Sequence, residues 1–155
     1  MERGKGPGIL VPPPVLFLAA LSVGVVLQIH EPARLLGRAW LGRLAGAALI
    51  VLGIFLSGSV MRRFGEARTP VTPWRPTRAL VVTGPYRFSR NPDYLGQTLL
   101  YCGIALAANS APILAMAVPA LLLVNFVIIP KEERYLEGRF AEEYRSYRKR
   151  VRRWL

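Results

Sequence analysis

The sequence predicts an all-α fold: an integral membrane helical bundle of about four transmembrane helices, followed by an amphipathic helix in the cytosol. Three observations lead to this prediction. Hydrophobic residues make up 52% of the chain, yet it carries 21 Lys and Arg against 9 Asp and Glu. The apolar residues are gathered in long runs, and most of the charges lie between or after these runs. This segregation indicates apolar spans in lipid joined by cationic segments, within one domain over residues 1–155.

The first expected span covers residues 9–29 and is almost entirely apolar. Pro12, Pro13 and Pro14 suit the beginning of a helix rather than its interior. A cleavable signal peptide is the alternative interpretation, but the sequence Gln-Ile-His-Glu-Pro that follows lacks the small residues of a cleavage site. We therefore expect a span that is retained.

The second expected span covers residues 44–61, the third residues 95–110 and the fourth residues 111–130. Only Asn109 and Ser110, followed closely by a proline, mark a boundary between the last two, which predicts a tight helical hairpin. Small residues recur on one face of the second and third spans, which predicts close helix packing in lipid. These residues are Gly46, Gly53 and Ser57 in one span and Gly96, Gly103 and Ala107 in the other.

The cations are concentrated in two polar segments. Residues 62–94 contain seven arginines and residues 131–155 contain nine lysines and arginines, whereas the loop between the first two spans contains three arginines. With four spans, both rich segments fall on the same side of the membrane. The excess of cations predicts that this side, with both termini, is cytoplasmic.

The residue types exclude some kinds of site. A single cysteine, Cys102, allows no intramolecular disulfide, and a single histidine, His30, cannot build a metal cluster, so we expect no metal. Nucleic-acid binding is not expected either, because the membrane topology already explains the cations.

The tail after the fourth span carries an apolar and aromatic stripe at helical spacing, which predicts an amphipathic helix. Its residues are Leu136, Phe140, Tyr144, Tyr147 and Val151. One interpretation is a basic helix that lies on anionic lipid. That does not explain Glu132 and Glu133, which stand where the span meets the cytoplasm. They predict either arginine partners from the preceding loop or a bound cation.

Asn125 is a polar residue inside the fourth span. It precedes Glu132 by seven residues, about two helical turns, so we expect both on nearly the same face. A buried amide needs a hydrogen-bond partner, which would be another helix or a ligand.

Two motifs separated by the helical hairpin carry a family resemblance. The stretch TRALVVTGPYRFSRNPDYLG and the later EERYLEGRFAEEYRSYRKRV are similar to the isoprenylcysteine carboxyl methyltransferase-like family of membrane proteins, with phospholipid N-methyltransferases as more distant relatives. The resemblance covers about residues 66–155. It implies transfer of a methyl group from S-adenosylmethionine to a lipid-like acceptor at the cytoplasmic membrane face.

The resemblance also implies which residues hold the cofactor. These are Arg78, Ala79, Leu80, Val81, Tyr86, Asn91, Pro92, Asp93, Tyr94 and Glu132, with Glu133 as a second carboxylate. A carboxylate can pair with the cofactor's ammonium group, and tyrosines can face its sulfonium or its base. Asn91 stands where the eukaryotic prenylcysteine enzymes have histidine, and Ile128 where they have an arginine for the substrate. Arg90 and Asn125 are therefore the candidate catalytic residues for the acceptor.

Two alternatives stay open at this point. The acceptor could be the amine of a phospholipid, which must lose a proton and needs a general base such as Asp93 or Glu133. Alternatively, the chain could be a membrane scaffold without enzymatic activity that binds anionic lipid through its basic helix.

Overall fold

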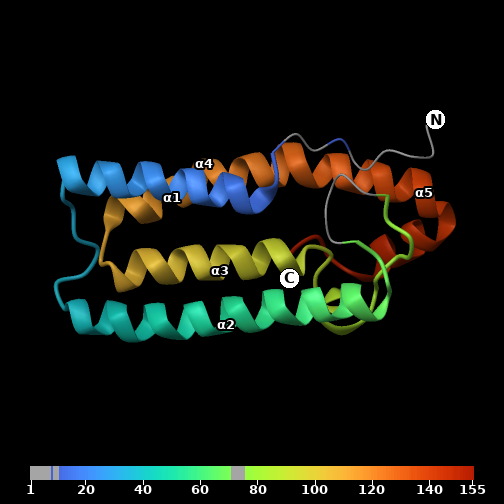
Figure 1. Cartoon of the computed structure of the whole chain (residues 1–155), viewed down its shortest axis with the longest axis horizontal. Coiled ribbons are helices and arrows are strands. Elements are labelled where there is room, and N and C mark those ends of the chain that lie inside the picture. The colour runs from blue at the N-terminus through green and yellow to red at the C-terminus, as the bar shows by residue number, and fades with distance from the viewer. Residues whose placement is uncertain (1–7, 9–10, 71–75) are drawn as a thin grey trace.

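The structure is a computed structural model that describes residues 8, 11–70 and 76–155, and every regular element in these ranges is helical. The prediction of an all-α fold is therefore confirmed (Figure 1). The elements are α1 (Pro13–His30), α2 (Ala39–Glu66), the 3₁₀ turn η1 (Gly84–Arg87), α3 (Pro92–Ala107), α4 (Ala111–Leu123), the π turn η2 (Val124–Ile128) and α5 (Ile129–Arg150).

The four helices α1 to α4 form two packed pairs. α2 packs along α3 and α1 packs along α4, and the α3–α4 hairpin joins the pairs, as predicted (Figure 1). The turns 31–38 and 108–110 lie at one end of the bundle. The segment 76–91 and α5 lie at the other end. The two cation-rich segments thus share one end of the molecule.

Three helices are long and apolar enough to cross a membrane: α1, α2 and the long helix that begins at Ala111. These helices support an integral membrane protein. With 16 residues, α3 is about 24 Å long, against a hydrocarbon core of about 30 Å, so its role as a fourth span stays a prediction. It begins at Pro92 rather than at residue 95, because proline fits the first turn of a helix. Residues 9 and 10 of the first predicted span lie outside the described residues.

Glycines allow α2 and α3 to approach closely, as the sequence predicted. A Cβ atom built on Gly46 would lie 2.5 Å from the carbonyl oxygen of Gly103. One built on Gly53 would lie 2.7 Å from that of Gly96. Any larger side chain at these positions would force the two backbones apart.

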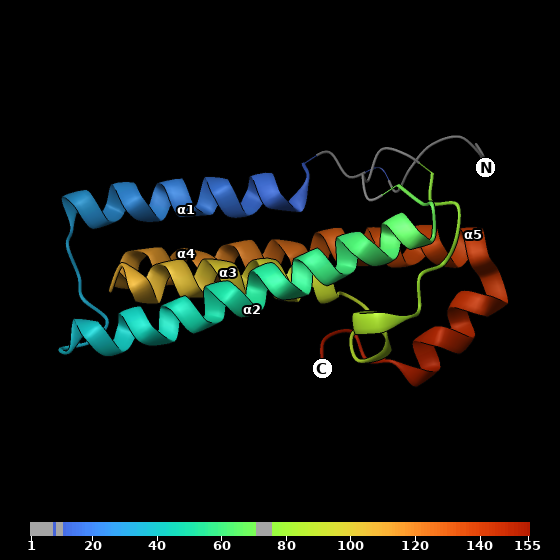
Figure 2. The same cartoon turned by 60° about the horizontal axis from the view of Figure 1, so that its bottom comes forward.

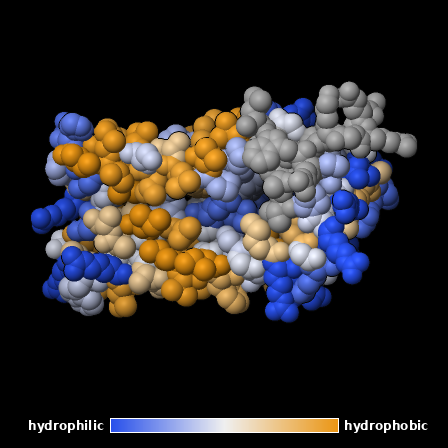
Figure 3. Space-filling view, in the orientation of Figure 1, coloured by the Kyte–Doolittle hydropathy of each residue, from blue (hydrophilic) through white to orange (hydrophobic). Residues whose placement is uncertain are grey.

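The outer surface of the bundle is apolar. Large hydrophobic side chains such as Leu18, Leu44, Ile54 and Phe55 point outward, and Phe55 is 73% exposed. Figure 3 shows hydrophobic residues over the body of the bundle and hydrophilic residues concentrated at its ends. In water such a surface would drive association, whereas in a bilayer it faces lipid.

The fourth predicted span and the tail helix form one long helix with two irregularities. The π turn η2 separates α4 from α5, and within α5 the backbone of Ala141 is not helical (φ 42°, ψ −112°). At this kink α5 turns back toward the bundle (Figure 2). Tyr144 and Tyr147 are consequently buried against the protein. For Tyr144 and Tyr147 the interpretation that the stripe lies on lipid was wrong, because the kink turns them toward the protein.

Candidate active site

A cavity of about 440 Å³ lies at the cation-rich end of the bundle. The start of α1, the last turns of α2, the segment 77–94 and α5 meet around it, and most of its lining is apolar or aromatic. Its size falls within the range of about 300–1,000 Å³ that is usual for small-molecule sites.

Most of the predicted site residues line this cavity. They are Ala79, Leu80, Val81, Tyr86, Arg90, Asn91, Asp93, Tyr94, Glu132 and Glu133. Arg78 and Pro92 are not among the lining residues. The backbone N–H of Arg78 donates to the hydroxyl of Thr69 at 2.8 Å, and Pro92 is buried in the first turn of α3. The segment that carries the family motif therefore forms one wall of the cavity.

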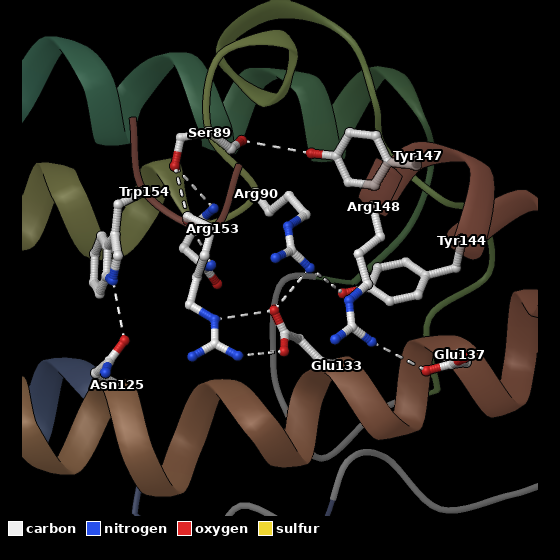
Figure 4. A network of polar contacts seen from close by, with 11 residues as sticks. Ser89, Arg90, Asn125, Glu133, Glu137, Tyr144, Tyr147, Arg148, Arg153 and Trp154 are labelled. Atoms are coloured by element: carbon white, nitrogen blue, oxygen red, sulfur yellow. Dashed lines mark hydrogen bonds and ion pairs between the residues drawn. The ribbon is translucent and has the colours of Figure 1, made fainter. Parts of the chain in front are cut away.

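Asn125 also lies away from the cavity lining. Its Oδ1 accepts a hydrogen bond of 3.0 Å from the indole N–H of Trp154 (Figure 4). The predicted common face with Glu132 assumed regular turns, but Asn125 lies in the π turn η2, whose turns are wider than those of an α-helix. The amide thus has its partner within the protein, and we do not retain Asn125 as a catalytic residue.

Glu132 is the first of two carboxylates in the α5 wall, just beyond the apolar run that ends at Pro130. The hydroxyl of Tyr94 donates to its Oε1 at 2.7 Å. Burial raises the pKa of Glu132 to about 7, the Tyr94 hydrogen bond opposes this shift, and the neighbouring carboxylate of Asp93 adds to it. No Lys or Arg of the described residues forms an ion pair with Glu132. The carboxylate is thus placed to receive a cationic group of a ligand.

Asp93 is the carboxylate of the α3 wall. The side-chain amide of Gln97 donates to its Oδ2 at 2.7 Å. Burial raises the pKa of Asp93, while hydrogen bonds from Gln97 and Ser57 lower it. Burial and the nearby carboxylates of Asp93 and Glu132 raise the pKa of Tyr86, so its phenol stays neutral. Two carboxylates and neutral aromatic rings make this part of the cavity suitable for an organic cation.

Glu133 has a different environment from Glu132. It is buried, and its carboxylate lies 2.8 Å from Nη1 of Arg90 and 2.7 Å from Nη2 of Arg153 (Figure 4). The predicted pairing with arginines is confirmed for Glu133. The first partner comes from the preceding loop, as expected, but the second comes from the tail. Cation binding stays a prediction for Glu132.

Sequence reasoning missed the residues that fix α5 over the cavity. The hydroxyl of Tyr147 donates to the backbone carbonyl of Tyr86 at 2.8 Å, and that of Tyr135 accepts from the N–H of Thr77 at 3.0 Å. The spacing of the tail aromatics marked an apolar stripe. It gave no sign that α5 would fold back, because alanine at the kink favours a continuous helix.

Comparisons with known proteins point to one family. A family model described as phospholipid methyltransferase matches residues 41–143. A protein of Haemophilus influenzae, described only as uncharacterized, is 51% identical over 35 residues, which are 23% of this chain and 56% of that protein. The chain thus spans little more than half the length of that relative. No solved structure matches the chain.

Proposed function

Because the chain belongs to the phospholipid methyltransferase family, we propose that it transfers the methyl group of S-adenosylmethionine to a hydrophobic, lipid-like acceptor. Membership in the family implies a methyltransferase, and the three long apolar helices support an integral membrane protein. The resemblance to the isoprenylcysteine carboxyl methyltransferase-like subfamily supports an acceptor with an apolar tail.

The observation that carries this proposal is the composition of the cavity wall. S-adenosylmethionine brings a sulfonium, an ammonium group, a carboxylate and an adenine. Glu132 would hold the ammonium group, and the rings of Tyr86 and Tyr94 would face the sulfonium or the base. Arg90 lies in the same wall and would meet the carboxylate. The residues present therefore fit the cofactor.

When bound, the cofactor would supply an electrophilic methyl group for an in-line displacement. The chain's contribution is to hold donor and acceptor at reacting distance and to keep water out. The folded-back part of α5 suits this task, because Tyr144 and Tyr147 are buried and line the cavity. The apolar side chains of Val60 and Met61 form a wall on the α2 side, where a lipid tail would pack.

The acceptor would enter sideways from the bilayer. The start of α1 and the end of α2 both line the cavity, although α1 packs on α4 and α2 packs on α3. A lipid tail could pass between these two ends without crossing the cofactor. With the cation-rich end in the cytoplasm, the site would lie at the cytoplasmic face of the membrane. Cysteines placed in the 31–38 loop and in the tail should then be labelled from opposite sides.

A phospholipid amine is the second candidate acceptor. The family description favours it, and so does the position of Asp93, whose carboxylate lines the cavity and could take the proton from an ammonium group. Glu133, the other candidate base, is occupied by two arginines. A carboxylate or thiolate acceptor would need no such base.

The test is a methyl-transfer assay with the purified protein in lipid nanodiscs. The protein would be incubated with S-adenosylmethionine that carries a labelled methyl group. Separate reactions would contain prenylated cysteine, amine phospholipids or water-soluble analogues of their head groups. We expect label in a lipidic acceptor and little in the soluble analogues. Label in none of the lipidic acceptors, or equal turnover of the soluble analogues, would contradict the proposal.

A further inference from the structure

Arg90 is the one cation among the described residues that line the cavity. Its side chain is only 10% exposed, and Nη1 contacts both Glu133 at 2.8 Å and the hydroxyl of Tyr144 at 3.4 Å. Its Nε is buried and, within the described part of the chain, has no hydrogen-bond partner. A buried guanidinium N–H without an acceptor is unfavourable, so this group suits an anionic group of a ligand.

Arg153 limits how many carboxylate oxygens of Glu133 can pair with Arg90. It donates from Nε to Oε1 at 3.2 Å and from Nη2 to Oε2 at 2.7 Å, so it engages both carboxylate oxygens (Figure 4). Arg90 contacts only one of these oxygens. The group of two arginines and one glutamate carries a net charge of +1 beside the cavity. Without Arg153, both oxygens of Glu133 could turn to Arg90 and neutralise it in a two-pronged ion pair.

The segment Val151–Leu155 is fixed so that Arg153 keeps this position. The backbone carbonyl of Arg152 accepts from the N–H of Arg90 at 2.9 Å, and that of Arg153 accepts from the amide of Asn91 at 2.9 Å. On the other side, the indole of Trp154 donates to Asn125 at 3.0 Å (Figure 4). None of the residues Val151–Leu155 is among the described lining residues. The segment therefore contacts residues of the cavity wall without lining the cavity itself.

We propose that Arg153 is a positioning residue that holds Glu133 and thereby leaves Arg90 incompletely paired and free to bind an anionic group of the ligand. This inference rests on the proposed function, because the ligand is either the cofactor, through its carboxylate, or an acceptor with an anionic head group. The hydrogen bonds of Trp154 and of the Val151–Leu155 backbone hold Arg153 within bonding distance of Glu133.

The experiment compares the binding of two nucleosides, S-adenosylmethionine and its decarboxylated analogue, by calorimetry in detergent. The variants are Arg153→Gln, Arg153→Lys and the control Arg148→Gln. Arg148 also pairs with a glutamate, Glu137, at 3.5 Å, but it is not among the lining residues. Arg153→Lys keeps the charge but loses the two-pronged geometry, so it should have an intermediate effect.

We expect Arg153→Gln to weaken S-adenosylmethionine binding by about tenfold or more, as loss of a charged hydrogen bond does, and to leave the decarboxylated analogue within about twofold. If the acceptor supplies the anion, Arg153→Gln should bind both nucleosides normally. The KM of this variant for an anionic lipid acceptor should rise instead, and that result would also support the inference. An equal loss for both nucleosides, with a lower melting temperature and no rescue by Arg153→Lys, would overturn it. So would the absence of any effect. Failure of the wild-type protein to bind either nucleoside would refute the proposed function itself.

Discussion

The two ends of the helical bundle use similar polar residues in different ways. At the end away from the cavity, the side chain of Asn109 accepts from the N–H of Leu36 at 2.8 Å and donates to its carbonyl at 2.9 Å. The hydroxyl of Ser110 donates to Gln28 at 2.6 Å and accepts from the N–H of Ile113 at 3.2 Å. Polar groups at this end therefore stabilise the turns of the bundle.

The cavity end leaves some of its polar groups without such partners. Glu132 is half-buried and accepts from Tyr94, but no described cation pairs with it. Arg90 has a buried Nε–H without an acceptor in the described residues, beside Glu133, which has two arginine partners. Groups left in this state lower the stability of the free protein unless a ligand supplies their partners. This difference supports the proposal that one end of the bundle serves stability and the other serves ligand binding.

The largest expected effect concerns Asp93, at the cavity end of the bundle. If the acceptor is a phospholipid amine, Asp93→Asn removes the general base and should lower kcat by about a hundredfold or more. The check is a methyl-transfer assay over pH 6–9 with amine and carboxylate acceptors. A normal rate with the amine would assign the proton transfer to another group.

The next effect is a pH dependence of stability at the cavity end. The pKa of Glu132 is about 7 in the folded protein, against an ordinary value of 4.5, so folding is favoured when this group is protonated. This stabilisation is fully present below pH 4.5 and is lost as the pH rises through 7. We expect the cofactor-free protein to lose on the order of 2 kcal/mol between pH 5 and pH 8.

Thermal unfolding of the wild type and of Glu132→Gln in the same detergent measures this dependence. The variant is neutral at every pH and should show a much flatter profile. Identical profiles for the two proteins would mean that Glu132 is not the group responsible.

A smaller effect is expected for cofactor binding. Only the ionised form of Glu132 pairs with an ammonium group, and a pKa of about 7 leaves a minority of it ionised at pH 6. S-adenosylmethionine should therefore bind about tenfold more tightly at pH 8 than at pH 6. Calorimetry in two buffers of different ionisation enthalpy would also detect the proton released on binding. A constant affinity over this range would argue against an ionic contact.

The smallest expected effect concerns Ser110, at the end of the bundle away from the cavity. Ser110→Ala removes the N-cap of α4 and the partner of Gln28. We expect a loss of stability of about 1 kcal/mol with unchanged affinity for the cofactor. Equal weakening of binding and of stability would show that the two ends are not independent.

Features with a regular spacing could be predicted from the sequence. Apolar runs marked the helices, and small residues spaced by seven and then four positions marked the contact between α2 and α3. The family motifs marked ten of the lining residues, and eight of these lie in the segment 79–94, because that contiguous stretch forms one wall of the cavity. These predictions needed only local sequence.

The remaining features depend on where the chain leaves a regular helix. The π turn at Val124–Ile128 and the kink at Ala141 decide that Asn125 meets Trp154 and that Arg153 meets Glu133. Pro130 has no N–H to donate to the carbonyl of Phe126, which accounts for the π turn, whereas no glycine or proline stands at Ala141. The residue types alone also could not distinguish Glu132 from Glu133, and only the family resemblance pointed to Glu132. Adjacent helical residues point about 100° apart, and only the fold shows which of them faces two arginines.

Glu132 is proposed to receive the cationic group of S-adenosylmethionine. The most direct measurement compares the affinity for this cofactor of Glu132→Ala and Glu142→Ala by calorimetry in detergent. Glu142 is a control on the same helix, 72% exposed and paired only with Arg145 among the described residues. Removing an ionic partner in a partly buried site costs a few kcal/mol, whereas an exposed charge costs less than about 1 kcal/mol. We predict a loss of about a hundredfold or more for Glu132→Ala and less than about fivefold for Glu142→Ala. Equal losses for the two variants would contradict the account.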